Sequence, residues 1–280
     1  MSEVKYNIKP LQEEVLKIFK VFAAICEKHG LRYYAAYGTA LGAIRHHGFI
    51  PWDDDFDVAM PRSDYNKFVN IVRGALPREL KFFRGGESKY GGISISRIVN
   101  VSEGIVDRLR EETNLDLPNA PFIDIFVLEA APTNVFDLKR VLREDKLWRM
   151  CQLWRYPETK YSFSRKWLLP IASVLGFFLT GRYRKTTDNE DMMLVRDEIK
   201  SHYETSEHVF EPVFFRNRES RLLPRIYFEP SRLVEFEDTQ IRVPSKVEEL
   251  LRIYYGDYMT PPPVEERIPE HVMRKTFSHI

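Results

Sequence analysis

The run Pro-Trp-Asp-Asp-Asp-Phe-Asp-Val at positions 51–58 places the strictest constraint on how this chain can fold. Aromatic and apolar residues interleave with its acidic residues, and a solvated acidic turn would not need them. The run predicts a strand over residues 55–60. Alternate side chains of a strand share a face, so Asp55 and Asp57 are expected to project together while Phe56 points into a core.

Two carboxylates on one face repel each other, and one of them tends to stay protonated unless a cation compensates the charge. Mg²⁺ is the expected cation because it prefers oxygen ligands and completes its shell with water and substrate phosphates. Asp53 lies one step earlier in the alternation and is a candidate third ligand. A calcium-binding loop would need more oxygen-bearing residues and a glycine turn. The sequence therefore predicts a magnesium site at Asp53, Asp55 and Asp57.

A second acidic position lies in the sequence Phe-Ile-Asp-Ile-Phe at 122–126, which is otherwise typical of a buried strand. A buried carboxylate is costly unless it is paired or bound to a metal. If this strand lies beside the first acidic strand, Asp124 converges with Asp55 and Asp57. Its role is then that of a general base or of a further metal ligand, and the residues leave both open.

Gly38 and Thr39 lie between a predicted strand and a predicted short helix. A glycine there lets the backbone approach a phosphate, and the N-terminus of a helix attracts negative charge. Arg45 and Arg97 are further candidates for phosphate contacts, because a guanidinium group matches phosphate oxygens. These four residues are the predicted binding residues for a phosphate-bearing substrate.

Apolar periodicity and turn residues outline the remaining elements. Ser63 and Ser245 are expected to cap the helices that follow them, the second within a capping box. The order of elements predicts an α+β fold, with a catalytic core over 1–132 and a mostly helical lobe over 133–280. The predicted helices span 11–29, 40–45, 63–76, 135–155, 188–202 and 245–255, and the predicted strands span 32–37, 55–60, 80–83, 93–99, 122–128 and 236–243, the last with a central turn.

Composition excludes some classes of protein. Lys plus Arg number 42 and Asp plus Glu number 41, so the net charge gives no support for a nucleic-acid-binding protein. Cys26 and Cys151 are too few for a disulfide scaffold and are expected to be buried apolar residues. No secretory signal is visible at the N-terminus. We therefore expect a cytoplasmic protein.

The segment 167–180, WLLPIASVLGFFLT, is a long apolar run that contains a proline. Its fourteen residues are too short to span about 30 Å of hydrocarbon comfortably. Basic residues flank it, so region 165–185 suits a peripheral contact with an anionic membrane. A buried helix or hairpin of the second lobe is the alternative.

The residues 37–45, YGTALGAIR, followed by 48–57, GFIPWDDDFD, resemble the signature of the LicD family. Residues 122–126 resemble a second block of that family, and residues 236–244 and 254–258 resemble its C-terminal blocks. The resemblance covers about residues 10–263 and is weakest over 135–215. It implies a nucleotidyltransferase-like core with a mixed sheet, in which Asp53, Asp55 and Asp57 match the acidic triplet.

The resemblance also implies an activity, because bacterial members transfer phosphocholine from CDP-choline to sugars of teichoic acid or lipopolysaccharide. Animal relatives such as the fukutin-related protein use CDP-ribitol, but their cysteine-rich zinc loop is absent here. The expected reaction is therefore Mg²⁺-dependent phosphocholine transfer with release of CMP. Transfer of another CDP-linked alditol, true nucleotidyl transfer from an NTP, and binding without catalysis are the alternatives. The oligomeric state is left open.

Overall fold

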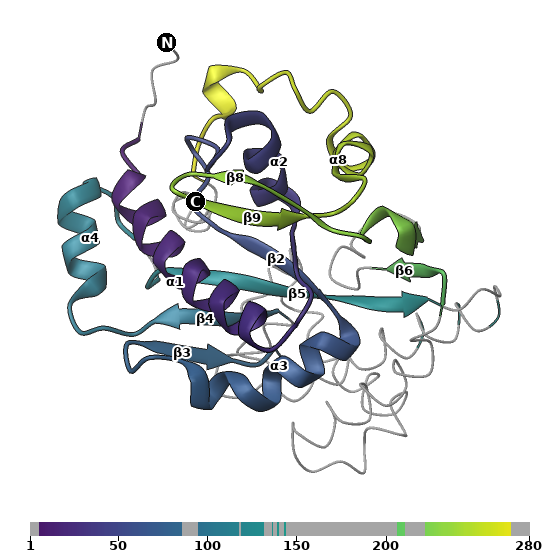
Figure 1. Ribbon diagram of the computed structural model, residues 1–280. Helices are drawn as coiled ribbons and strands as arrows, with labels where there is room; N and C mark the ends of the chain where they lie inside the picture. Colours follow the sequence, from purple (N-terminus) through teal and green to yellow (C-terminus); the bar gives the residue numbers. More distant parts are fainter. Residues whose placement is uncertain are drawn as a thin grey trace, which may run out of the picture. The chain divides into compact units, whose positions relative to one another are not determined.

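The structure is a computed structural model (Figure 1). It describes residues 6–85, 95–117, 119–131, 206–210 and 222–269, together with the single positions 136, 139 and 143. Several predictions fall largely or wholly outside the described residues and stay predictions. They are the helices over 135–155 and 188–202, the burial of Cys151, and the apolar segment 167–180.

The chain divides into two compact units. The first contains Met1–Phe82, Arg97–Phe126 and Pro224–Ile280, and the second contains Phe83–Ser96 and Val127–Leu223. The C-terminal residues therefore cluster with the N-terminal ones. The predicted boundary at residue 132, with a mostly helical lobe beyond it, stays a prediction.

A sheet forms the centre of the fold, with its strands in the order β1-β2-β5-β4-β3. β1 is antiparallel to β2, whereas a hydrogen bond from the Asp124 N–H to the Phe56 carbonyl (2.8 Å) joins β5 to the residue before β2. In the second unit, the end of β5 pairs with β6 in antiparallel register. The strands are β1 (Tyr34–Ala35), β2 (Asp57–Pro61), β3 (Leu80–Phe83), β4 (Ser96–Asn100), β5 (Phe122–Ala131), β6 (His208–Phe210) and β7 (Leu223–Pro224).

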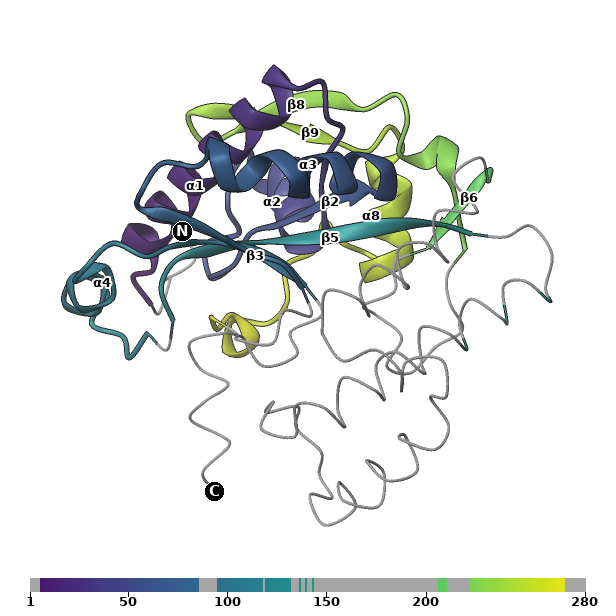
Figure 2. The same ribbon diagram turned by 90° about the horizontal axis from the view of Figure 1, so that it is seen from below.

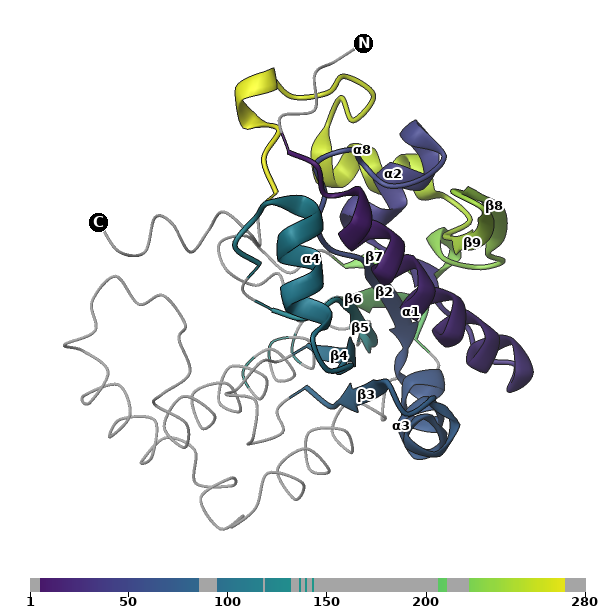
Figure 3. The ribbon, with the colours of Figure 1, turned by 90° about the vertical axis from the view of Figure 1, so that its left-hand side faces the viewer.

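Helices and one hairpin complete the first unit. The β8–β9 hairpin lies on the same side of the sheet as α1 and α3 (Figure 2), and α4 lies beside α1 (Figure 3). The combination of helices and sheet confirms the α+β class. The elements are α1 (Lys9–Lys28), α2 (Tyr37–His46), α3 (Arg62–Ala75), α4 (Ile105–Thr113), β8 (Arg232–Phe236), β9 (Thr239–Val243) and α8 (Val247–Tyr255), with 3₁₀ turns η5 (Arg225–Tyr227) and η6 (Val264–Glu266).

The predicted first helix is confirmed as α1, which buries the apolar residues that recur at three- and four-residue spacing. Gly30 follows its end with φ of 62°, a left-handed conformation that glycine adopts without strain. The helix is long but amphipathic. Within the described ranges, no helix combines the length and apolarity that crossing a membrane would need.

Both predicted helix caps are wrong. α3 begins at Arg62 with Pro61 as its N-cap, and α8 begins at Val247 with Lys246 as its N-cap. Neither N-cap residue makes a side-chain capping bond. Each helix has at least one acidic side chain in its first turn, which interacts favourably with the helix dipole. This interaction stabilises the start of each helix in the absence of a serine cap.

Aromatic side chains form the core between α1, the sheet and the hairpin. Phe56 lies at its centre, with its ring centroid 4.7 Å from that of Phe19, 5.7 Å from that of Phe49 and 5.5 Å from that of Phe236. Its side chain is fully buried. Residues from three other parts of the sequence thus hold the position that directly precedes Asp57.

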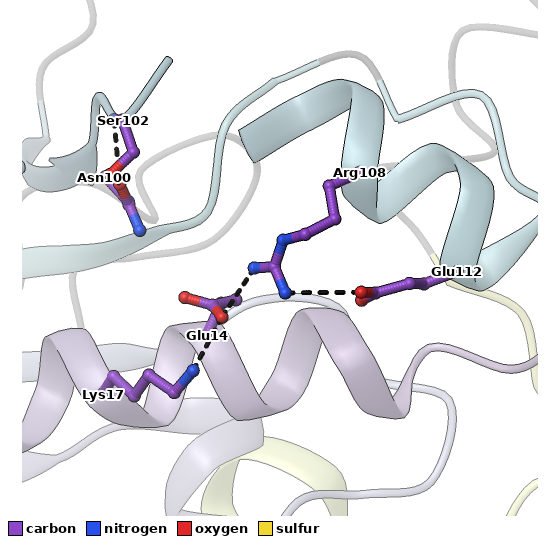
Figure 4. Close-up of polar contacts among 6 residues, drawn as sticks. All are labelled: Glu14, Lys17, Asn100, Ser102, Arg108 and Glu112. Carbon is purple, nitrogen blue, oxygen red and sulfur yellow. Dashed lines mark hydrogen bonds and ion pairs between the residues drawn. The ribbon is translucent and has the colours of Figure 1, made fainter. Parts of the chain in front are cut away.

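A buried carboxylate joins α1 to α4 (Figure 4). Glu14 accepts hydrogen bonds from Lys17 and from Arg108 of α4, each at 2.7 Å. Burial alone would raise the pKa of Glu14, but these two hydrogen bonds lower it below its ordinary value. The same residues line a cavity of about 420 Å³, whose walls contain none of the predicted site residues.

We expect Glu14→Gln to lower the free energy of unfolding by about 1 kcal/mol at pH 7, because it removes a charged acceptor of two hydrogen bonds. Because folding lowers the pKa of Glu14, this carboxylate stabilises the fold at pH values above its ordinary pKa of about 4.3. The stabilisation is lost as the pH falls through the pKa of Glu14 in the folded protein. The difference between the two proteins should therefore shrink below about pH 4.3 in urea titrations. Glu112→Gln, which changes an exposed partner of Arg108, is the control and should have little effect. Equal losses in both variants would contradict the assignment.

Candidate active site

Asp57 is the first residue of β2, and its side chain is buried, with 8% of its surface exposed. The strand is shorter than predicted at its N-terminal end, so Asp55 lies before it, in a segment without regular secondary structure. The alternation argument therefore applies to Asp57 directly, but Asp55 is not a strand residue. Both nevertheless contribute to one acidic cluster, because the charge of Asp55 acts on Asp57.

The electrostatic environment of Asp57 is strongly unfavourable to its charged form. Burial, and then the charges of Asp55, Asp124 and Asp53, raise the pKa of Asp57 well above its ordinary value, and the charge of Arg97 lowers it in part. The backbone N–H and the backbone carbonyl of Asp57 both have hydrogen-bond partners, so the unfavourable environment acts on its carboxylate. The four predicted acidic residues thus lie near one another, and Arg97 offsets only part of the repulsion that acts on Asp57.

Asp124 of β5 is held by Arg97 of β4. The Nε of Arg97 donates to Oδ1 of Asp124 at 2.5 Å, and Nη2 donates to Oδ2 at 3.0 Å. The Arg97 guanidinium also lies 4.0 Å from the centroid of the Phe122 ring. Arg97 was predicted as a phosphate contact. The structure gives it a defined partner, which orients Asp124 and partly offsets the acidic charge.

The first turn of α2 is fastened to the start of β2. The backbone N–H of Asp57 donates to Oγ1 of Thr39 (2.8 Å), and the N–H of Ala36 donates to the Asp57 carbonyl (3.0 Å). Gly38 permits a close approach, because a Cβ there would lie 2.6 Å from Oδ2 of Asp53. The N-terminus of α2 therefore faces the acidic cluster, and its dipole favours negative charge.

Two polar residues that the sequence did not single out hold the loop before the acidic cluster. Gln12, which is buried on α1, donates through Nε2 to the carbonyls of Ile50 (3.1 Å) and Asp53 (2.9 Å). Glu237, in the hairpin turn, accepts from the N–H of Phe49 at 3.1 Å. The position of Gln12, a polar residue on the apolar face of a predicted helix, could have indicated that its side chain has a buried hydrogen-bond partner. Glu237 lies in the 236–244 block that resembles the family, and the sequence predicted no role for it.

Arg45 lies at the other end of α2 from Thr39. Its Nη1 donates to the carbonyl of Tyr258 (2.7 Å), and its Nε donates to Nε2 of His46 (2.9 Å). Burial, and then Arg45 and His47, lower the pKa of His46, which favours the neutral ring that accepts this bond. The predicted phosphate contact of Arg45 stays a prediction.

The residues fit a magnesium ion through few direct ligands. In the part of the chain that the structure describes, no group of three or more His, Cys, Asp or Glu side chains is arranged to hold a metal. Mg²⁺ commonly takes one or two carboxylates, with waters and substrate phosphates as its other ligands. A buried Asp57 beside Asp55 offers that donor set. The three-ligand arrangement stays a prediction.

These features define a class of protein. An α+β domain whose clustered carboxylates lie on two neighbouring strands, β2 and β5, and just before β2, facing the N-terminus of a helix, is the arrangement of a nucleotidyltransferase-like domain. Residues 30–175 match the family model described as "LicD/FKTN/FKRP, nucleotidyltransferase domain". The chain belongs to this family, which confirms the predicted LicD relationship.

The relatives differ in how much of the chain they cover. The chain is 29% identical to the lipopolysaccharide cholinephosphotransferase LicD of Haemophilus influenzae over 278 aligned residues. The alignment covers 96% of this chain and 97% of that protein. An uncharacterised protein of Rickettsia prowazekii is 46% identical over 61 residues, which are 21% of this chain and 23% of that protein. An uncharacterised protein of Rickettsia typhi is 42% identical over 45 residues, 16% of this chain and 15% of that protein.

Replacing Thr39 tests how Asp57 is held. Thr39→Val keeps the side-chain shape but leaves the buried N–H of Asp57 without its acceptor, which we expect to cost about 1–3 kcal/mol of unfolding free energy. Thr39→Ser keeps the hydroxyl and should lose much less. Denaturant unfolding of both variants measures the difference. Equal stability of the valine and serine variants would show that the hydroxyl does not support Asp57.

Proposed function

We propose that the protein transfers phosphocholine from CDP-choline to a sugar hydroxyl of a cell-surface glycan and releases CMP. The near-complete alignment with a lipopolysaccharide cholinephosphotransferase carries this proposal, since it covers 96% of this chain. The acidic cluster, in which Asp57 and Asp124 are buried, lies within the residues that match the family model. A lipopolysaccharide or teichoic acid precursor is the proposed acceptor.

Asp55 and Asp57 are the proposed ligands of Mg²⁺, with Asp53 as a third or water-mediated ligand. When bound, Mg²⁺ would neutralise the charge that develops on the CMP leaving group. Occupation by a cation would also remove the repulsion that raises the pKa of Asp57. Gly38 and Thr39 place the first turn of α2 beside these carboxylates, where backbone N–H groups favour a donor phosphate.

Asp124 has two candidate roles, general base and metal ligand. Its bidentate pair with Arg97 favours the ionised form and fixes the orientation of the carboxylate. A carboxylate stabilised in this way accepts a proton less readily. The pair therefore supports a ligand or positioning role more than that of the base that deprotonates the acceptor hydroxyl. Arg97 acts through Asp124 in this proposal.

The family description supports one further candidate activity. A nucleotidyltransferase domain could move a nucleoside monophosphate from an NTP and release pyrophosphate, using the same acidic residues. Another CDP-linked alditol, ribitol or glycerol, would keep the main reaction and change only the transferred group. The proposal includes no nucleic-acid partner. We also propose that the protein is cytoplasmic and contacts the membrane peripherally through residues 165–185.

The direct test incubates the full chain and Mg²⁺ with labelled CDP-choline, CDP-ribitol, CDP-glycerol or CTP, each with glycan acceptors. We expect glycan-dependent CMP release from CDP-choline. Release of pyrophosphate from CTP, without turnover of any CDP donor, would contradict the proposal and support nucleotidyl transfer.

Asp57→Asn should lower turnover by about 100-fold or more, because asparagine has nearly the same shape as aspartate but lacks the charged oxygen of the proposed metal ligand. Asp116→Asn makes the same chemical change at a side chain that is 98% exposed, and it should leave turnover unchanged. Circular dichroism of both variants checks the fold. Full activity of Asp57→Asn would show that this carboxylate is not part of the catalytic site.

A further inference from the structure

Four side chains from two distant parts of the sequence form a connected group at the C-terminal end of α2. The guanidinium carbon of Arg267 lies 5.1 Å from the centroid of the Trp52 ring. The ring centroids of Trp52 and His46 are 6.3 Å apart, and the two ring planes meet at 82°. His46 also accepts a hydrogen bond from Arg45. We refer to Arg45, His46, Trp52 and Arg267 as the arginine cluster. Arg267 follows the short turn η6 near the C-terminus.

Neither arginine of this cluster pairs directly with an acidic side chain in the described part of the chain, although the charge of Asp53 acts on Arg45. Arg45 donates to the Tyr258 carbonyl, and Nε of Arg267 donates to the Pro262 carbonyl at 2.9 Å. Across the described ranges, neither forms an ion pair with Asp or Glu. Burial, and then the charge of Arg267, lower the pKa of Arg45. Two guanidinium groups therefore lie close enough to repel each other.

Helix geometry explains only part of this arrangement. A cation near the C-terminus of a helix is stabilised by about 0.3–1 kcal/mol, which accounts for Arg45 at the end of α2. Arg267 does not belong to α2. It is placed by its stacking on Trp52 and by the bond to Pro262. A second guanidinium beside the first is costly unless an anion joins them.

The cluster lies next to the acidic run. Trp52 directly precedes Asp53, and the charge of Asp53 acts on Arg45. Among the described residues, Nη2 of Arg45 and both Nη groups of Arg267 have no hydrogen-bond partner. These donors suit a phosphate, because guanidinium groups form paired, charge-assisted hydrogen bonds with phosphate oxygens.

We propose that Arg45 and Arg267 form a subsite that binds a phosphate group of the nucleotide donor, and that Trp52 and His46 hold the two guanidinium groups in place. This inference rests on the proposed function for the identity of the donor. The phosphate group offsets the repulsion between the arginines, and the acidic cluster lies close by for the metal. Arg267 is thus a specificity-determining residue for phosphate-bearing ligands.

Calorimetric binding of CMP and of cytidine to the full chain, in the presence of Mg²⁺, tests the subsite without relying on turnover. We expect Arg267→Ala to weaken CMP binding by about tenfold or more, because charge-assisted hydrogen bonds are lost. Cytidine binding should not change, since cytidine lacks the phosphate. Arg267→Lys keeps the charge without the planar fork and should give an intermediate affinity. Arg252→Ala removes an exposed arginine of α8 and should bind CMP like the wild type.

Steady-state kinetics distinguish the source of the phosphate. A raised KM for the CDP donor in Arg267→Ala, with an unchanged KM for the acceptor, supports the assignment. A raised KM for a phosphorylated acceptor alone would overturn it in favour of an acceptor phosphate. Equal CMP affinity in Arg267→Ala and wild type would overturn the subsite itself, even if phosphocholine transfer is observed. Arg267-dependent CMP binding without phosphocholine transfer would keep the subsite and refute the proposed function.

Discussion

The candidate site depends on two adjacent side chains, one among aromatic rings and the other among like charges. Phe56 lies among aromatic rings contributed by α1, the loop before the acidic run and the hairpin, so its position is set by the core. The next residue, Asp57, begins β2, and its side chain lies instead among the charges of Asp55, Asp124 and Asp53. Burial of the aromatic residue therefore stabilises the placement of a carboxylate among like charges.

Residues far apart in the sequence maintain this arrangement. Gln12 holds two carbonyls of the preceding loop, Glu237 holds the N–H of Phe49, and Thr39 holds the N–H of Asp57. Arg97 fixes Asp124 on the neighbouring part of the sheet. None of these contacts acts through long-range electrostatic attraction. They are short hydrogen bonds that give the acidic residues defined positions before any substrate binds.

Local patterns predicted the parts of the structure that local forces determine. The apolar spacing of α1, the buried strand around Asp124 and the chain reversal inside 236–243 were predicted and are confirmed. The start of β2 and the two serine caps were predicted wrongly, because tertiary packing and the proline before α3 set those boundaries. The pairing of Arg97 with Asp124 and the stacking of Arg267 on Trp52 join distant residues, and no spacing rule encodes them.

We propose that the buried charge of Asp57 requires a divalent cation. The most direct measurement compares the unfolding free energies of wild type and Asp57→Asn with and without Mg²⁺. Without metal, the asparagine variant should be at least as stable as the wild type, because one uncompensated buried charge is gone. At about 100 times its dissociation constant, Mg²⁺ should stabilise the wild type by about 2.7 kcal/mol and the variant much less. Equal stabilisation of both proteins, or none in either, would contradict the claim.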